Sequence, residues 1–488
     1  MHKITITLLF VAHFVFGQYP SGFQEESFGS WNLPMNVTFD NANRMYVTER
    51  DGRFYLYNNN QKTLLIDLRE EVATYGDFGL LSAALDPNFQ QNGYVYLYYV
   101  VDRHHLLHFG TSNYSSSADE QGATICRLTR FTLNPANGFN SLLPNSRLVL
   151  IGETKSSGFP MTGIYHSGGD LKFAIDGSLL VSCGDGASGA DYENQALSDG
   201  IISQEEYNAR RLWRCQIPNS LNGKIVRINP VNGDGISSNP FYVAALPRSP
   251  QSRVYALGFR NPFRFSIKPG TGSHSLEEGN AGVLYVGDVG QEAKEEINVV
   301  SAAGQNFGWP RWEGIDHAYD NNPSYNPSNP KKPTIEWGRA GSTARVVINN
   351  VVQNVGSGAF PHSSFVGGAA IGGVFYEGDD YPTEYHGSYF FAEFNNRWVK
   401  NFQFDDAQNP TSKIDFHPEI PGLISFVYNK HDECIYFTAV TGVVKKIKYA
   451  PFGNQAPTAR FTNNLTFGSS PLNVTFDATS STDPENGP

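Results

Sequence analysis

The amino-acid sequence predicts an all-β protein built as a six-bladed β-propeller. Six segments each combine an alternating apolar strand, a turn rich in Asp, Asn or Gly, and a second strand. Period-two alternation with such turns is typical of antiparallel hairpins. Six hairpins in series indicate the blades of a propeller, a closed ring that leaves few strand edges exposed. Frequent Gly (48) and Pro (28), with 13% aromatic and only 17% charged residues, also favour turn-rich β-structure.

The repeated segments are unevenly spaced along the chain. They comprise residues 36–58, 80–100, 170–186, 264–291, 371–404 and 423–449. Long insertions at 100–125, 186–223 and 311–360 separate some of them, and we expect these insertions at the faces of the ring, where ligands bind. Residues 203–213 carry the one clear helical pattern, which indicates a short helix on a surface loop.

Both ends of the chain differ from the repeated segments. Residues 1–17 combine a short basic start, an apolar stretch and a small-residue end, which predicts a signal peptide and a secreted protein, extracellular or periplasmic. An N-terminal anchor or a buried strand is the alternative, although the stretch is short for a membrane span and no later run is long enough. We therefore assign the propeller to residues 18–450. Residues 451–488 open as a Pro-containing linker and continue as short Thr/Ser-rich strands.

Charge and cysteine content limit the classes of partner. The formal net charge of −11, without a long basic run, argues against a nucleic-acid partner. The four cysteines do not have zinc-ligand spacing, and in an exported protein they could form up to two disulfides. Several pairings are open; Cys183 with Cys215 is favoured because these two residues flank the second insertion.

A histidine precedes a glycine turn in "YHSGGDLKFAIDGSLLVSCGDG", residues 165–186. At the mouth of a propeller His166 would suit general-base catalysis, because imidazole titrates near neutral pH. Gly168 and Gly169 would let a ligand approach the backbone closely. The alternative is a surface histidine that only bonds a neighbour, and the residues alone leave both open.

Two further stretches carry ligand-binding chemistry. In "LGFRNPFRF" the guanidinium of Arg260 suits a carboxylate or a conjugated ring, and Pro262 holds Asn261 in an extended conformation. A structural salt bridge is the alternative there. Residues 284–314 form an oxygen-rich turn around Gly290 that could bind calcium, although its spacing is not that of an EF-hand.

These motifs together resemble a known family. "HSGGDLKFAIDGSLLVSCGDG", "LNGKIVRINP", "LGFRNPFRF", "GDVGQEAKEEINVV" and "GQNFGWP" occur in the order seen in soluble glucose/sorbosone dehydrogenases. Those enzymes are secreted six-bladed propellers that use pyrroloquinoline quinone and calcium, and hedgehog-interacting-protein-like proteins share the propeller. The resemblance covers about residues 25–448. Residues 451–488 resemble the start of a polycystic-kidney-disease-type domain, an immunoglobulin-like sandwich that is truncated here.

The resemblance implies a role for several residues. His166 corresponds to the catalytic base, which takes a proton from the sugar hydroxyl while hydride passes to the quinone. Arg260 and Asn261 correspond to a pair that contacts the quinone oxygens. The main-chain carbonyls of Gly290 and Gln291 correspond to ligands of the calcium that polarises the quinone.

The sequence also departs from the family pattern among the cofactor-binding positions. Asp77 stands where the family has a glutamine, and Arg397 is the candidate substitute for a lysine that grips the cofactor. Residues 421–429, "PGLISFVYN", lack two arginines that clamp the quinone carboxylates. Arg345 and Arg311, both from the third insertion, are candidate replacements for this charge.

These observations predict a secreted sugar or aldose dehydrogenase that oxidises a sugar hydroxyl by hydride transfer to pyrroloquinoline quinone and passes electrons to an external acceptor. The departures favour an alternative, a catalytically silent propeller that binds glycans or protein partners. A third possibility is a glycosidase, which would need two carboxyl groups about 5–10 Å apart in the mouth. Asp185, Asp288 and Glu292 are the candidates for that pair.

Overall fold

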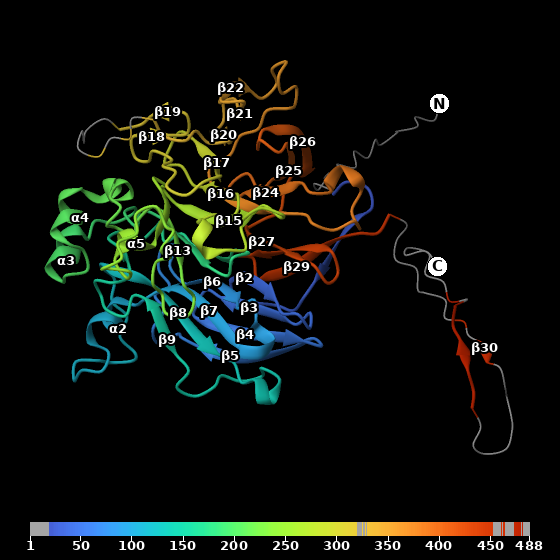
Figure 1. Ribbon diagram of the computed structural model, residues 1–488, viewed down its shortest axis with the longest axis horizontal. Coiled ribbons are helices and arrows are strands. Elements are labelled where there is room, and N and C mark those ends of the chain that lie inside the picture. The colour runs from blue at the N-terminus through green and yellow to red at the C-terminus, as the bar shows by residue number, and fades with distance from the viewer. Residues whose placement is uncertain are drawn as a thin grey trace, which may run out of the picture.

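The computed structural model describes residues 19–319, 325, 327, 329–451, 460, 462–463, 473–479 and 481. Six antiparallel sheets of four to six strands form the main body of the molecule (Figure 1). Neighbouring blades contact one another through their first strands around a common centre, except that blade 3 meets the first strand of blade 4 through its second strand. The predicted all-β, six-bladed propeller is confirmed, and each of the six repeated segments contributes one blade.

The blades follow one another in chain order. Blade 1 consists of β2 (Pro34–Phe39), β3 (Met45–Glu49), β4 (Arg53–Asn58) and β5 (Gln61–Asp67). Blade 2 consists of β6 (Leu80–Leu85), β7 (Tyr94–Val100), β8 (Thr124–Thr132), β9 (Leu148–Ile151) and β10 (Phe159–Met161). Blade 3 consists of β11 (Leu171–Phe173), β12 (Leu179–Cys183), β13 (Lys224–Ile228) and β14 (Val254–Leu257). Blade 4 consists of β15 (Pro262–Ile267), β16 (Leu284–Asp288), β17 (Glu295–Val300), β20 (Ile335–Trp337), β21 (Arg345–Ile348) and β22 (Val351–Asn354). Blade 5 consists of β23 (Ala370–Phe375), β24 (Tyr389–Glu393), β25 (Val399–Phe404) and β26 (Pro410–His417). Blade 6 consists of β27 (Leu423–Asn429), β28 (Cys434–Ala439), β29 (Val443–Tyr449) and β1 (Phe23–Ser27).

Helices are few and short. The α-helices are α1 (Phe89–Asn92), α2 (Arg103–His108), α3 (Glu193–Ser198), α4 (Gln204–Asn208) and α5 (Pro250–Arg253). The 3-10 helices are η1 (Pro135–Asn137), η2 (Arg211–Gln216), η3 (Leu276–Glu278) and η5 (Thr383–Tyr385). The helix predicted over 203–213 is thus two short helices, α4 and η2. Ser203 and Glu206 begin α4 with a capping box, in which each side chain bonds the backbone N–H of the other residue.

The N-terminal strand closes the ring. β1 pairs antiparallel with β29, so that Phe23 lies opposite Tyr449, and it becomes the outer strand of the last blade. The Phe23 ring is buried and packs edge-on against Tyr381, Tyr385 and Phe416, which belong to blade 5 and its loops. The beginning and the end of the propeller are therefore held together by strand pairing and by aromatic packing.

A buried arginine joins four blades at the centre of the ring. Arg264 lies on β15 of blade 4, and its Nη1 donates to the carbonyl of Gly169 at 2.6 Å, just before β11. Its Nη2 donates to Met35 of β2 at 2.9 Å and its Nε to Ile424 of β27 at 3.1 Å. These main-chain carbonyls would lack a partner in an apolar centre, so the guanidinium satisfies blades 1, 3 and 6 at once.

The connections between second and third strands carry the first two insertions. Residues 101–123 follow β7 in blade 2 and residues 184–223 follow β12 in blade 3. The third insertion differs from the prediction, because much of it does not lie on a face of the ring. Its segments β20, β21 and β22 pair in series beyond β17, so they widen the sheet of blade 4 at its outer edge (Figure 1).

The favoured Cys183–Cys215 disulfide is not formed: all four cysteines are buried free thiols. Cys183 ends β12 and faces blade 2, where it lies beside Cys126 and Tyr98. Cys215 belongs to η2 and packs against the backbone of Gly223. The two thiols flank the same insertion in sequence, but the strand and the helix direct them to different contacts.

Little of either end falls within the described residues. The expected signal peptide, residues 1–17, lies outside them. From the expected immunoglobulin-like sandwich, β30 (Thr462–Asn463) and β31 (Phe476–Asp477) are described and pair with each other; the rest of that prediction lies outside the described residues. In the described part of the chain, no helix has both the length and the apolar character needed to cross a membrane.

Candidate active site

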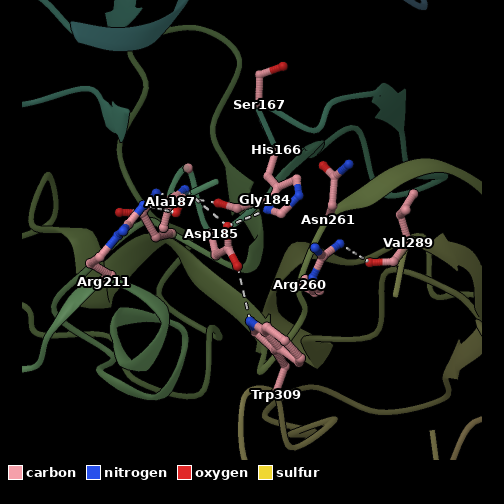
Figure 2. Close-up of polar contacts among 12 residues, drawn as sticks. His166, Ser167, Gly184, Asp185, Ala187, Arg211, Arg260, Asn261, Val289 and Trp309 are labelled. Atoms are coloured by element: carbon pink, nitrogen blue, oxygen red, sulfur yellow. Dashed lines mark hydrogen bonds and ion pairs between the residues drawn. The ribbon is translucent and has the colours of Figure 1, made fainter. Parts of the chain in front are cut away.

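His166 and Asp185 form a hydrogen-bonded pair at the start of blade 3 (Figure 2). The imidazole Nδ1 lies 2.7 Å from Asp185 Oδ1, in a site where Asp185 is fully buried and His166 is 8% exposed. A carboxylate at this distance accepts a hydrogen bond, so Nδ1 carries the proton. Nε2 makes no hydrogen bond with any described residue and keeps its lone pair free.

The backbone around His166 is held in an unusual conformation. His166 has φ +69°, which non-glycine residues rarely adopt. Its N–H donates to Asp77 Oδ2 at 2.6 Å, and the Ser167 hydroxyl donates to Asp77 Oδ1 at 3.1 Å. The N–H of Gly168 donates to Asn261 Oδ1 at 3.1 Å. Asp77 and Asn261 therefore act here on the turn that presents the imidazole.

Asp185 is an ionised carboxylate with several donors. Trp309 Nε1 donates to its Oδ2 at 3.1 Å, and the N–H of Ala187 donates to Oδ1 at 3.1 Å. Burial alone would raise the pKa of Asp185, but the adjacent His166 and Arg260 hold that pKa below its ordinary value. The charged form is thus maintained beside the imidazole, which fixes the orientation of the His166 ring.

Arg260 lies next to this pair and is held by one buried carboxylate. Asp288 accepts the backbone N–H of Arg260 at 3.1 Å and that of Asn261 at 2.6 Å. The guanidinium donates through Nη1 to the carbonyl of Val289 at 2.9 Å, and its carbon lies 5.4 Å from the centre of the Trp309 ring. Its buried Nε has no hydrogen-bond partner, which leaves one donor unused.

A cavity of about 480 Å³ opens over these groups. His166 and Arg260 line it from blades 3 and 4, Gln291 and Glu292 from the β16–β17 connection, and Arg211 from η2. Two guanidinium groups therefore face one space with an imidazole. Such a site favours an anionic ligand with planar acceptor groups.

Arg211 is a cavity residue that the sequence did not indicate. Its Nη2 donates to the carbonyls of Ala187 and, at 2.6 Å, Ala190, and its Nη1 forms an ion pair with Asp191 at 3.3 Å, while its buried Nε has no hydrogen-bond partner. The residue belongs to the short helical stretch that was interpreted as a surface feature. Trp309, from the motif "GQNFGWP", also belongs to the site, because its Nε1 donates to Asp185. The signal that could have indicated Arg211 is its place in a long polar insertion between two strands of one blade.

The loop expected to hold calcium has converging N–H groups on one side. The backbone N–H groups of residues 291–294 all donate to Glu313 Oε1, at 2.7 to 3.1 Å. The N–H of Gly290 donates to Glu295, whereas the carbonyl of this buried glycine accepts no hydrogen bond from the described residues. The Gln291 carbonyl accepts from Arg339 Nη2 at 3.2 Å. A hard cation suits such carbonyl oxygens.

Other expected cofactor residues do not line this cavity in the described part of the chain. Asp77 lies behind the His166 turn. Arg397 is exposed and forms an ion pair with Glu419 at 2.7 Å. Arg345 is engaged by Asp316 and Glu336 at the outer edge of blade 4. The cationic groups at the cavity are thus Arg260, which was expected, and Arg211, which was not.

The fold and this site define a class: six-bladed propellers with a polar ligand cavity between the blade connections. Within that class, the chain belongs to the glucose/sorbosone dehydrogenase family, whose sequence model matches residues 31–442.

Curated relatives are distant. The HIPL1 protein of Arabidopsis thaliana is 23% identical over 488 residues, covering 88% of this chain and 63% of that protein. Quinoprotein glucose dehydrogenase B of Acinetobacter calcoaceticus is 25% identical over 291 residues, covering 58% of this chain and 51% of that protein. The chain thus spans less than two thirds of the length of either relative.

Solved structures share the fold. The pyrroloquinoline quinone-bound aldose sugar dehydrogenase of Streptomyces coelicolor matches with a TM-score of 0.56 at 17% identity, covering 88% of this chain and 99% of that one. The soluble aldose sugar dehydrogenase of Escherichia coli, in its apo form, matches with a TM-score of 0.58 at 17% identity, covering 88% and 99%. At this identity the likeness concerns the propeller itself.

Proposed function

We propose that this protein is a secreted sugar or aldose dehydrogenase that uses pyrroloquinoline quinone and calcium. The observation that carries the proposal is the His166–Asp185 pair, which opens onto a cavity lined by Arg260 and Arg211. An imidazole with a free Nε2 suits proton removal from a hydroxyl group, and two guanidinium groups suit a multiply anionic cofactor. Family membership gives the same direction.

The residues at the cavity fit the quinone. Arg260 and Arg211 would hold its carboxylates or carbonyl oxygens, because each has an Nε donor without a partner and lines the space. Beneath the cavity, Gly184 lets blade 3 pack closely on the His166 turn, since a Cβ there would lie 2.3 Å from the His166 carbonyl and 2.8 Å from Asn261 Oδ1. Asn261, which follows Arg260 in the same turn, would help to orient the quinone ring.

The loop after β16 fits calcium. The unpaired carbonyl of Gly290 would be one ligand, and that of Gln291 a second once Arg339, which is on the surface, moves aside. When bound, the cofactor supplies a conjugated dicarbonyl that accepts hydride from the sugar carbon, and calcium makes that dicarbonyl more electrophilic.

The chain's own residues would bind the substrate hydroxyl and move its proton. His166 Nε2 would accept the proton from the hydroxyl of the sugar. Asp185 would keep Nδ1 protonated and stabilise the imidazolium that forms. An external electron acceptor would then reoxidise the cofactor. Secretion from the signal peptide at residues 1–17 is part of the proposal, as are the absence of a membrane span and of a nucleic-acid partner.

A titration with quinone in the presence of calcium tests the proposal, followed by absorbance and calorimetry. We expect a Kd in the micromolar range or tighter. Arg211→Gln should weaken it about tenfold, since one charge-assisted contact from a half-exposed guanidinium contributes about 1.5 kcal/mol at most. Arg210→Gln is the matched control, because that neighbouring arginine does not line the cavity. Absence of quinone binding by the wild-type protein would rule out the proposed dehydrogenase function.

His166→Ala tests the chemistry separately. The quinone-loaded variant should keep its fold and its quinone affinity, while kcat for aldose oxidation falls about 10²–10⁴-fold, as expected for loss of a general base. Turnover equal to that of the wild type would rule out His166 as the base.

A silent propeller that binds glycans or proteins is the second candidate. Residues 423–429 favour it, because this β27 segment has no arginine, and Arg397 is paired away from the cavity. The same titration distinguishes the two candidates. The glycosidase gains no support, since Glu292 is the one carboxylate among the described residues that line the cavity, while Asp185 and Asp288 are engaged by His166 and by backbone N–H groups.

A further inference from the structure

The insertion of blade 2 gathers three metal-ligating side chains outside the cavity described above. His104, His108 and Glu120 each offer one ligand atom, and these atoms all lie within 4.8 Å of one another. All three side chains are half-buried, so they are shielded from bulk water and still reachable by an ion. None of them takes part in the His166 site.

The local fold explains how these groups meet. Asp102 begins α2, and its Oδ1 accepts the N–H of His105 at 3.1 Å. His104 and His108 are four residues apart on this helix and therefore lie on one face, with ring centres 4.8 Å apart. The loop that follows α2 returns to the helix, where Glu120 is held by Arg103 Nε at 2.7 Å.

Each donor could supply one ligand atom to a metal ion. His104 Nε2 accepts the N–H of Ser115 at 3.0 Å, which orients the ring, and a metal ion bound at this nitrogen would replace that hydrogen bond. His108 makes no side-chain hydrogen bond with the described residues. Arg103 occupies Oε1 of Glu120, which leaves Oε2 of the same carboxylate. Because Arg103 also offsets the charge of Glu120, the two imidazoles would provide most of the affinity.

We propose that His104, His108 and Glu120 bind a Zn²⁺ ion. Two imidazole nitrogens and one carboxylate oxygen form a donor set that suits zinc, whereas calcium prefers oxygen ligands alone. Three protein ligands leave a fourth position for water. Bound zinc would fasten the loop of residues 109–122 to α2 at both of its ends.

This zinc site would also act on the neighbouring insertion. Arg103 Nη2 forms an ion pair with Asp199 at 2.7 Å, and the N–H of Ala123 donates to Gln195 Oε1 at 2.8 Å. Both partners belong to the 184–223 insertion, which also carries Arg211. Zinc would therefore stabilise the contact between the blade 2 insertion and the insertion that carries the cavity residue Arg211.

Zinc titration of the purified chain in excess calcium tests the proposal, by calorimetry and by metal analysis after dialysis. The excess calcium occupies oxygen-only sites. We expect one zinc per chain with a micromolar or tighter Kd, weakened about tenfold or more in both His108→Gln and Glu120→Gln. His274→Gln is the matched control, because His274 is exposed and lies in another blade.

Hydrogen exchange provides a second measurement. Zinc should slow exchange in residues 103–122 of the wild type and leave it unchanged in His108→Gln. Absence of saturable zinc binding, or a zinc affinity in His108→Gln equal to that of the wild type, would overturn the proposal. The titration uses protein without quinone, so its result is independent of the dehydrogenase function.

Discussion

At the scale of single residues, the site depends on buried carboxylates that orient other groups. Asp185 fixes the imidazole of His166, Asp77 bonds the backbone of the same turn, and Asp288 holds the Arg260–Asn261 turn. Each carboxylate accepts main-chain N–H groups, which compensates part of the cost of burying its charge. The residues that would contact ligand therefore rest on a preorganised polar layer beneath them.

Asp185→Asn should separate orientation from binding. The amide can donate to Nδ1, which favours the wrong tautomer and leaves Nε2 protonated, so kcat should fall roughly 10²–10⁴-fold. KM and quinone affinity should change little, because Asp185 does not line the cavity. Steady-state kinetics and the quinone titration measure both, with the exposed Asp406→Asn as control. A loss in KM alone would contradict this positioning role.

At the scale of elements, the chain closes its ring with its own first strand. β1 completes blade 6 through five paired positions with β29. Phe23 is the buried residue of β1, and its ring contacts four aromatic rings, those of Tyr381, Tyr385, Phe416 and Tyr449. Two short helices in the insertions also position side chains: α2 places His104 and His108 near Glu120, and η2 places Arg211 at the cavity. Their stability comes from tertiary contacts, since helices this short are marginal alone.

Phe23→Ala should weaken the closure of the ring. Removing a buried phenyl ring costs about 3–5 kcal/mol of unfolding free energy, from lost burial and from the cavity left behind. Denaturant unfolding followed by tryptophan fluorescence measures the change. Ser27→Ala, which alters an exposed side chain on the same strand, should change stability by about 0.5 kcal/mol or less. Equal stability of the two variants would show that the packing of Phe23 on β1 contributes little to the stability of the closed ring.

At the scale of the whole molecule, the blades share one polar centre. Arg264 donates to carbonyls of three other blades, and burial lowers its pKa although the nearby Asp170 opposes that shift. Neighbouring blades otherwise contact one another through apolar clusters; one cluster joins Tyr98 and Phe159 of blade 2 to Leu179 of blade 3. A propeller lacks a single central core, so a group that reaches several blades has a large effect on the whole ring.

Arg264→Met should destabilise the whole propeller. The substitution leaves the carbonyls of Gly169, Met35 and Ile424 without their donor, and we expect a loss of about 3 kcal/mol or more. Arg264→Lys keeps the charge and part of the donor capacity, so its stability should be intermediate. Thermal unfolding of both variants checks the order. A methionine variant as stable as the wild type would show that water replaces the guanidinium at the centre.

Much of the fold could be predicted because strand alternation and turn residues are local signals. The six repeated segments each became a blade, and His166, Arg260 and Asn261 do meet although nearly a hundred residues separate them. The predicted disulfide was wrong, because strand direction rather than sequence distance decides where a thiol points. The third insertion was expected on a face, and local patterns could not reveal that its strands would pair with blade 4.

Residue type and period were enough to predict the propeller, its blade order and the motifs that carry family membership. The packing of the loops, in contrast, brings Arg211 to Arg260 at the cavity, Trp309 to Asp185, and Glu120 to two histidines on α2. Loops have no period of their own, and where their side chains lie is set by the surfaces against which they pack.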